Sequence, residues 1–273
     1  AFDSAVSHEA SFECQIKEDA LLALPAKLLL DIVSRLPNGD LVFTSKDSLV
    51  TIKSKSGKYQ IRSVSPDDYP VLEPFDEEPI LASLSAETLL SGLSTTLFAA
   101  SEDPVKGTLA GVRMTLEFER FELATTDGHR LSVARLKSEE AVSEGIALTI
   151  PAKPLQELFR MVELSGADWV NSQIYKTHFV FTAGGYQLAI RLLEGQYPNY
   201  PQLIPNSFAR KMGIDRKEFI AALERVLVLA AQKKGIVKFD LSQAEQELVI
   251  TVDAVDLGTA KEVVPVKFQG EDL

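Results

Sequence analysis

The segment 125–131, Thr-Thr-Asp-Gly-His-Arg-Leu, holds the residues best suited to chemistry in this chain. Asp127 and His129 stand two positions apart, and a carboxylate beside an imidazole can act as an acid–base pair. No nucleophile, metal-ligand set or phosphate loop accompanies them. A Gly between two strands is more typical of a tight turn in which an Asp side chain accepts backbone hydrogen bonds. We therefore predict a turn here, with the acid–base pair as the alternative.

Recognisable catalytic motifs are otherwise absent from the sequence. It contains no phosphate-binding Gly-x-x-x-x-Gly-Lys-Ser/Thr, no Gly-x-Gly-x-x-Gly, no Gly-x-Ser-x-Gly and no His-Glu-x-x-His. The single cysteine, Cys14, excludes a CxxC metal site and an intrachain disulfide. His8 and His178 are scattered, and we interpret them as ordinary surface or strand residues. The sequence thus predicts no metal, cofactor or catalytic residue.

Composition indicates a soluble globular protein. The chain has 273 residues, of which 45% are hydrophobic and 25% charged. It has no apolar stretch approaching the roughly 18 residues of a membrane span, and its start lacks the features of a signal peptide. We therefore expect a cytoplasmic location and no membrane contact. The formal net charge of −11 argues against general nucleic-acid binding, but the 28 Lys and Arg residues could gather on one surface.

The sequence repeats itself at the length of a domain. Leu24-Pro25-Ala26-Lys27 returns as Ile150-Pro151-Ala152-Lys153, an offset of 151 − 25 = 126 residues, and the segment 84–89 returns at 214–219. The first copy is matched only from the second half of the repeat, and the third stops about halfway through. We interpret the chain as a segment of a three-domain protein, with domains at 1–76, 77–206 and 207–273.

Within each copy a helical pattern precedes alternating strands. Ser85 and Asp215 are predicted helix N-caps, and strands are expected at 112–118 and 237–241. Further helices are predicted to carry Pro25 and Pro151 in their first turns. Their expected buried stripes are Leu28, Leu29, Ile32 and Val33 in one helix and Leu155, Leu158, Phe159 and Val162 in the other.

Hairpins and connectors complete each predicted unit. Strands at 49–52 and 59–64 flank one Gly turn, and strands at 178–181 and 186–192 flank another. The Pro-rich segments 69–74 and 197–205 are expected to connect domains. Each complete unit is thus predicted to be a pair of helix-plus-sheet modules.

Three motifs together resemble the bacterial DNA polymerase III beta subunit, the sliding clamp. They are the string Ala-Thr-Thr-Asp-Gly-His-Arg-Leu at 124–131, Glu-Gly-Gln-Tyr-Pro at 194–198, and the paired Pro-Ala-Lys segments. The resemblance covers essentially all 273 residues in order. It implies an α+β fold of tandem clamp domains, each with two helices packed on antiparallel sheets, forming an arc of a ring. The chain would begin after the first part of domain I and end within domain III.

The resemblance also implies a function and partners. Full-length members form a homodimer that closes head-to-tail around double-stranded DNA, without reading its sequence. Such a clamp is a non-catalytic processivity factor that tethers the replicative polymerase. The expected protein partners are the DNA polymerase III alpha subunit, the clamp loader and other proteins carrying a clamp-binding motif.

Site residues are carried over from the family by matching motif. The implied peptide-binding groove includes Leu109, Thr126, Gly128, His129, Arg130, Leu131, Pro198 and Leu203. An apolar floor with a few fixed polar groups suits a short hydrophobic peptide. The family's C-terminal strand, which completes this groove, is not in the sequence.

Two further sets of residues have implied roles. Lys27, Lys153, Arg225 and Lys106 are expected to face DNA, with surface lysines as the alternative interpretation. Lys27 and Lys153 occupy the same repeat position, which would line a pore with positive charge. Tyr69, Val228 and Leu229 match the dimer interface, although Val228 and Leu229 could instead be core residues.

Two other classes of function remain open at this point. The chain could be an interaction scaffold that uses the same groove without encircling DNA. It could also be a small-molecule enzyme built around Asp127, His129 and Arg130, which would need a perturbed acid–base pair.

Overall fold

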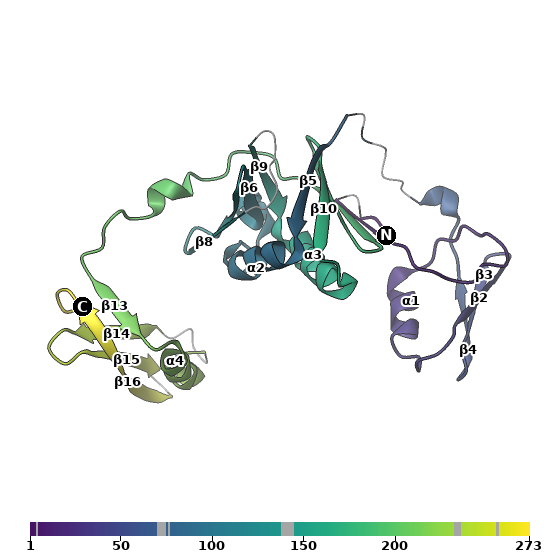
Figure 1. The fold of residues 1–273 in the computed structure, drawn as a ribbon. Coiled ribbons are helices and arrows are strands. Elements are labelled where there is room, and N and C mark those ends of the chain that lie inside the picture. Colours follow the sequence, from purple (N-terminus) through teal and green to yellow (C-terminus); the bar gives the residue numbers. More distant parts are fainter. Residues whose placement is uncertain (4, 70–74, 76, 138–144, 232–235, 255–256) are drawn as a thin grey trace. The chain divides into compact units, whose positions relative to one another are not determined.

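The chain folds into two compact units, Ala1–Pro198 and Asn199–Leu273 (Figure 1). The computed structural model describes residues 1–273 except 4, 70–74, 76, 138–144, 232–235 and 255–256. Each unit has a hydrophobic core of its own. Within the described residues, no helix has the length and apolar character needed to span a membrane.

The central part of the first unit contains two modules with the same order of elements: a strand, a helix and three strands. The first module is β5 (Ile80–Ser85), α2 (Ala86–Thr96), β6 (Gly111–Glu117), β7 (Arg120–Thr126) and β8 (Leu131–Leu136), with short 3-10 helices η2 (Leu97–Ala99) and η3 (Pro104–Ala110) after α2. The second is β9 (Ile146–Pro151), α3 (Ala152–Ser165), β10 (Trp169–Ile174), β11 (His178–Ala183) and β12 (Tyr186–Arg191). This order confirms the predicted pair of helix-plus-sheet modules.

The two modules exchange their first strands. β5 leaves its own module and pairs antiparallel with β10, while β9 pairs antiparallel with β6. The resulting sheets have the orders β8-β7-β6-β9 and β1-β12-β11-β10-β5. Each sheet therefore contains strands of both modules, and neither module completes its sheet alone.

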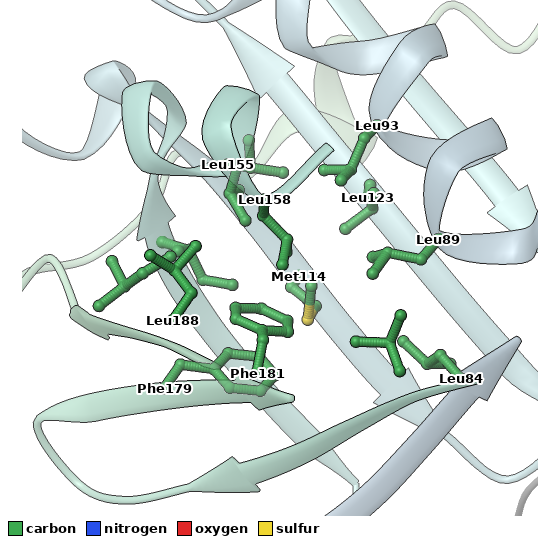
Figure 2. Packing of buried hydrophobic residues seen from close by; sticks show 14 of the residues in the cluster. Leu84, Leu89, Leu93, Met114, Leu123, Leu155, Leu158, Phe179, Phe181 and Leu188 are labelled. Atoms are coloured by element: carbon green, nitrogen blue, oxygen red, sulfur yellow. The ribbon is translucent and has the colours of Figure 1, made fainter. Parts of the chain in front are cut away.

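The core lies where helices α2 and α3 meet the two sheets (Figure 2). Leu89 and Leu93 of α2 and Leu155 and Leu158 of α3 are completely buried. Their spacing of three or four residues places each pair on one helix face. Burying one such side chain contributes roughly 1.5–3 kcal/mol, so this contact between modules is a main source of stability. In Figure 2 these leucines point toward Met114 of β6 and toward the rings of Phe179 and Phe181 on β11.

The helix starts confirm the predicted caps. Ser85 Oγ accepts the backbone N–H of Thr88 at 3.2 Å, and Asp215 Oδ1 accepts those of Lys217 and Glu218. The prediction for the prolines was wrong by one position. Pro25 and Pro151 have extended ψ angles of 106° and 133°, so they precede the helices as N-caps.

The N-terminal part of the first unit has a smaller sheet. Its elements are β1 (Val6–Ala10), α1 (Ala26–Val33), β2 (Val42–Lys46), β3 (Leu49–Lys53), β4 (Lys58–Arg62) and the 3-10 helix η1 (Pro66–Asp68). β2, β3 and β4 form an antiparallel sheet in that order. The hairpins predicted around the Gly turns are confirmed here and at β11–β12.

The buried stripe predicted on α1 was wrong. Leu28 is exposed, and no described side chain of α1 is fully buried, whereas Leu155, Leu158 and Val162 of α3 are. The cause is the surroundings of each helix. α3 packs against α2 and against strands of both sheets, and α1 has no such helix partner within the described residues.

Strand β1 joins the sheet of the central modules, not the sheet of its sequence neighbours. It pairs with β12 over five residues, from Val6↔Ile190 to Ala10↔Tyr186. Just beyond, the Ser11 N–H donates to the Gly185 carbonyl at 2.8 Å, and a Cβ on Gly185 would lie 2.5 Å from the Ser11 oxygen. His8 Nε2 also lies 2.8 Å from Glu157 Oε2 on α3. The first residues of the chain are thus fastened to β12 and α3.

The described residues of the second unit form one α-helix, one short 3-10 helix and one antiparallel sheet. Its elements are η4 (Tyr200–Leu203), β13 (Lys211–Ile214), α4 (Arg216–Ala230), β14 (Val237–Ser242), β15 (Glu247–Ala254) and β16 (Gly258–Gln269), with sheet order β13-β16-β15-β14. Ala222 and Val226 of α4 are completely buried against β15 and β16. The predicted helix after Asp215 and the predicted strand at 237–241 are both confirmed.

The two predicted connectors differ in what the structure describes. Residues 70–74 of the first lie outside the described part of the chain. The second, 197–205, contains the boundary between the units, Pro198 to Asn199, and the short helix η4.

Ser172 provides a test of the core. Its side chain is 3% exposed, and its Oγ has no hydrogen-bond partner among the described residues. Because no hydrogen bond is removed, Ser172→Ala should leave the free energy of unfolding unchanged or raise it by up to about 1 kcal/mol. Ser132→Ala is the matched control, since Ser132 Oγ donates to the Thr95 carbonyl at 2.7 Å. Urea denaturation should show a loss of stability only for the control, and an equal loss for both would contradict the assignment.

Candidate functional site

The predicted turn lies between β7 and β8. β7 ends at Thr126 and β8 begins at Leu131. Asp127 Oδ1 accepts the backbone N–H groups of His129 at 2.9 Å and Arg130 at 3.1 Å. Gly128 has φ of +93°, a conformation that side chains disfavour. The structure therefore confirms a turn in which Asp127 bonds the backbone.

Asp127 is committed to holding this turn. In addition to the backbone bonds, its Oδ2 accepts the Nε–H of Arg130 at 3.0 Å. The backbone N–H of His129, followed by the N–H groups of Arg130, lowers the pKa of Asp127 to about 2. The carboxylate is ionised at neutral pH, and its bond to His129 is with the backbone, not with the imidazole. This arrangement does not provide the acid–base pair considered from the sequence.

Cationic side chains surround the turn. The Arg130 guanidinium carbon lies 5.6 Å from the centre of the Phe98 ring, within the range of a cation–π contact. Lys106 Nζ, on η3, donates to the Asp127 carbonyl at 3.1 Å. His129 is exposed. The turn therefore presents positive and aromatic groups side by side.

The end of helix α2 supports both sides of the turn. Thr125 Oγ1 donates to the Thr96 carbonyl at 2.5 Å, and Ser132 Oγ donates to the Thr95 carbonyl at 2.7 Å. The last carbonyls of a helix have no partner within the helix. These two hydroxyls satisfy them and at the same time fix where β7 and β8 enter the turn.

A second segment meets the turn from far along the sequence. The backbone N–H of Thr126 donates to the hydroxyl of Tyr197 at 3.1 Å, a contact 71 residues apart. Burial raises the pKa of Tyr197 to about 12, so this hydroxyl is protonated at neutral pH. The contact brings the turn together with the segment that carries Pro198. Sequence reasoning noted Tyr197 only as part of a motif and did not assign it a role.

The predicted groove residues are distributed over both units. Thr126, Gly128, His129, Arg130 and Leu131 are brought together by the turn, and Pro198 follows Tyr197 directly. Leu109 and Leu131 are half-buried and Pro198 is exposed. Leu203 belongs to the second unit, where it is 66% exposed at the end of η4.

The predicted DNA-facing residues have different surroundings. Lys27 and Lys153 are both exposed and both are the second residue of their helices, α1 and α3. Arg225 of α4 instead forms two hydrogen bonds with Glu262, Nε–Oε1 at 2.9 Å and Nη2–Oε2 at 2.7 Å. These bonds to Arg225 lower the pKa of Glu262. Lys106 lies at the turn, bonded to the Asp127 carbonyl.

The predicted interface residues also differ in exposure. Tyr69 and Val228 are 42% and 67% exposed, so Val228 is not a core residue of this structure. Leu229 is half-buried and packs against the core of the second unit, in part as the alternative interpretation expected.

Comparison with protein families gives matches along the chain. Models of the DNA polymerase III beta subunit match its N-terminal domain at residues 1–73, its central domain at 83–199 and its C-terminal domain at 201–273. The beta sliding clamp of Synechococcus elongatus is 40% identical over 276 residues, covering 100% of this chain and 73% of the relative. That of Synechocystis is 41% identical over 291 residues, covering 99% and 74%.

Solved structures give the same match. The DNA polymerase III beta subunit of Thermotoga maritima has a TM-score of 0.90 at 23% identity, covering 99% of this chain and 73% of that one. A sliding clamp from Bartonella birtlesii, solved bound to griselimycin, has a TM-score of 0.90 at 27% identity and covers the same shares.

The bonds of Asp127 predict how the turn responds to pH. A carboxyl whose pKa is lowered on folding stabilises the structure above its unfolded value near 4, and this contribution is lost as pH falls toward about 2. The carboxyl-carbon chemical shift of Asp127 should therefore stay constant from pH 7 to 4 and change with a midpoint near 2. Asp127→Asn should alter the amide shifts of His129 and Arg130 at pH 7, while Asp168→Asn, at an exposed carboxylate, should not. A midpoint near 4 would contradict the role given to Asp127.

Proposed function

The chain belongs to the DNA polymerase III beta subunit family and is a DNA sliding clamp, a non-catalytic processivity factor; on that premise we propose that the turn 126–131 forms one wall of its partner-binding groove. The observation that carries this proposal is the rigid turn itself. Asp127, α2 and Tyr197 each hold it by hydrogen bonds. A wall fixed before binding reduces the entropy lost when a peptide docks.

The groove combines an apolar surface with positive charge. Leu109, Leu131 and Pro198 supply apolar area, and Gly128 exposes the backbone at the turn. Arg130 and Lys106 supply positive charge, and His129 supplies a ring nitrogen that can donate a hydrogen bond. Apolar contacts provide affinity and the few polar groups provide orientation. We propose that a short hydrophobic segment of a partner protein binds here.

Sliding clamps act with DNA and with polymerases or other clamp-binding proteins. For this chain we propose the DNA polymerase III alpha subunit and the clamp loader as partners at the groove. The Bartonella clamp binds griselimycin, and we propose that this chain binds it too. These ligands provide probes for the groove experiments.

The ring and its interior are proposed on the same family basis. We propose that the full-length protein forms a homodimer through Tyr69, Val228 and Leu229, with domains at 1–76, 77–206 and 207–273, and acts in the cytoplasm. Exposure of Tyr69 and Val228 supports this role. Lys27 and Lys153 are proposed to face DNA, because both are exposed at the same position of two helices. Arg225, already bonded to Glu262, would have to exchange this partner for a phosphate.

His129 and Arg130 test the groove. Replacing either by Ala removes a donor and should weaken a peptide that copies the clamp-binding segment of the polymerase alpha subunit by roughly five- to thirtyfold, about 1–2 kcal/mol. Isothermal titration calorimetry measures the affinity, and sedimentation should show an unchanged oligomeric state. Lys137→Ala, at an exposed residue of the same domain, is the control. If the affinity of both groove variants equals that of the wild type, the groove assignment is wrong.

Lys27 and Lys153 test the DNA-facing surface. Replacing both by Glu should weaken binding to duplex DNA and reduce the slope of log K against log[salt] by up to about two, close to one for each phosphate that no longer meets a lysine. The control replaces Lys53 and Lys58 by Glu, which changes the net charge equally on exposed strand positions. Fluorescence anisotropy at several salt concentrations separates the two pairs. Identical slopes for both pairs would remove Lys27 and Lys153 from the DNA-facing set.

A further inference from the structure

The segment 193–198, called the strap below, forms hydrogen bonds with three elements. The Leu193 N–H donates to the Thr149 carbonyl of β9 at 2.9 Å. Thr108 Oγ1 of η3 donates to the Gln196 carbonyl at 3.4 Å. Near its end, the hydroxyl of Tyr197 accepts the N–H of Thr126 at the end of β7. The strap is thus bonded to β9, η3 and β7.

We propose that Tyr197 is a positioning residue of the groove, whose hydroxyl fixes the turn 126–131 to the strap. Neither Tyr197 nor its hydroxyl is among the groove residues implied by the family. The proposal rests on the proposed function, because it assumes that the turn contacts a peptide. It assigns a specific role to one oxygen atom: holding together the two segments that carry Thr126 and Pro198.

Burial makes this hydrogen bond important. Thr126 and Tyr197 are each 6% exposed, so water does not readily replace the hydroxyl as a partner for the Thr126 N–H. A buried N–H that loses its acceptor costs more free energy than one at the surface does. Because burial raises its pKa to about 12, the hydroxyl does not change its protonation state in the physiological range. The bond is therefore a constant part of the folded domain.

The position of Thr126 in turn determines the geometry of the turn. Thr126 Oγ1 accepts the N–H of Gly128 at 3.1 Å, and Gly128 holds the left-handed conformation that reverses the chain. His129 and Arg130 follow directly. A shift of Thr126 would therefore displace the two donors that face the partner.

The hydroxyl can be removed without removing the ring. Tyr197→Phe keeps the buried aromatic group and its packing, and deletes the oxygen that accepts the Thr126 N–H. The matched control is Tyr186→Phe, which deletes an exposed hydroxyl on β12. Both are made in the 273-residue chain, and circular dichroism confirms folding.

Amide hydrogen exchange is the direct measurement. In Tyr197→Phe, exchange at Thr126 and Gly128 should accelerate about tenfold, while amides in β6 and β10 keep their protection. The affinity for the polymerase alpha peptide, with griselimycin as a second probe, should fall roughly five- to tenfold. Tyr186→Phe should change neither quantity.

A double variant shows whether Tyr197 acts through the turn. If it does, adding Tyr197→Phe to His129→Ala should weaken peptide binding by clearly less than the product of the two single effects. Unchanged exchange at Thr126, or a general loss of protection throughout the domain, would overturn the proposal. Failure of the wild-type chain to bind either probe would overturn the proposed groove instead, and the exchange data would still decide whether the hydroxyl holds the turn.

Discussion

The hydrophobic core between α2, α3 and the two sheets is complete because each module contributes its first strand to the sheet of the other. β5 and β9 exchange places, so the two sheets and the two helices have to form together. A single module can cover only part of the apolar stripe of its helix. The contrast between α3, whose stripe is buried, and α1, whose described side chains are not fully buried, shows this dependence within one chain. Helix propensity alone does not stabilise segments this short.

The candidate site inherits its geometry from this core. Leu89 and Leu93 fix α2 against the sheets, and the last carbonyls of α2 then receive hydroxyls from both flanks of the turn. The position of the exposed donors therefore depends on the buried packing of α2 and on the two hydrogen bonds at its end. This explains how a surface turn containing Gly can keep one shape: its conformation is determined by the residues beneath it as well as by Asp127.

Local features of the fold could be predicted from the sequence, because their causes lie within a few residues. The caps at Ser85 and Asp215, the hairpins and the Asp127 turn all belong to this class. The family motifs added which turn residues to consider for a groove.

Features that depend on distant residues could not be predicted in this way. Hydrophobic periodicity predicted the helices that follow β5 and β9, but not that each strand would join the other module's sheet. The same limit applies to the Tyr197 contact with Thr126 and to the pairing of Arg225 with Glu262. The apolar pattern of α1 predicted the helix but not the exposure of its side chains, because burial depends on neighbours that the pattern does not specify.

The pairing of β1 with β12 gives the N-terminal domain two mechanical attachments to the central one. One is the covalent chain from Tyr69 to Ile80, and the other is the five-residue ladder backed by the His8–Glu157 contact. A force that pulls the two domains apart is therefore shared between these two attachments. If a protease cut the chain between Tyr69 and Ile80, the β1–β12 ladder would still hold the two pieces together.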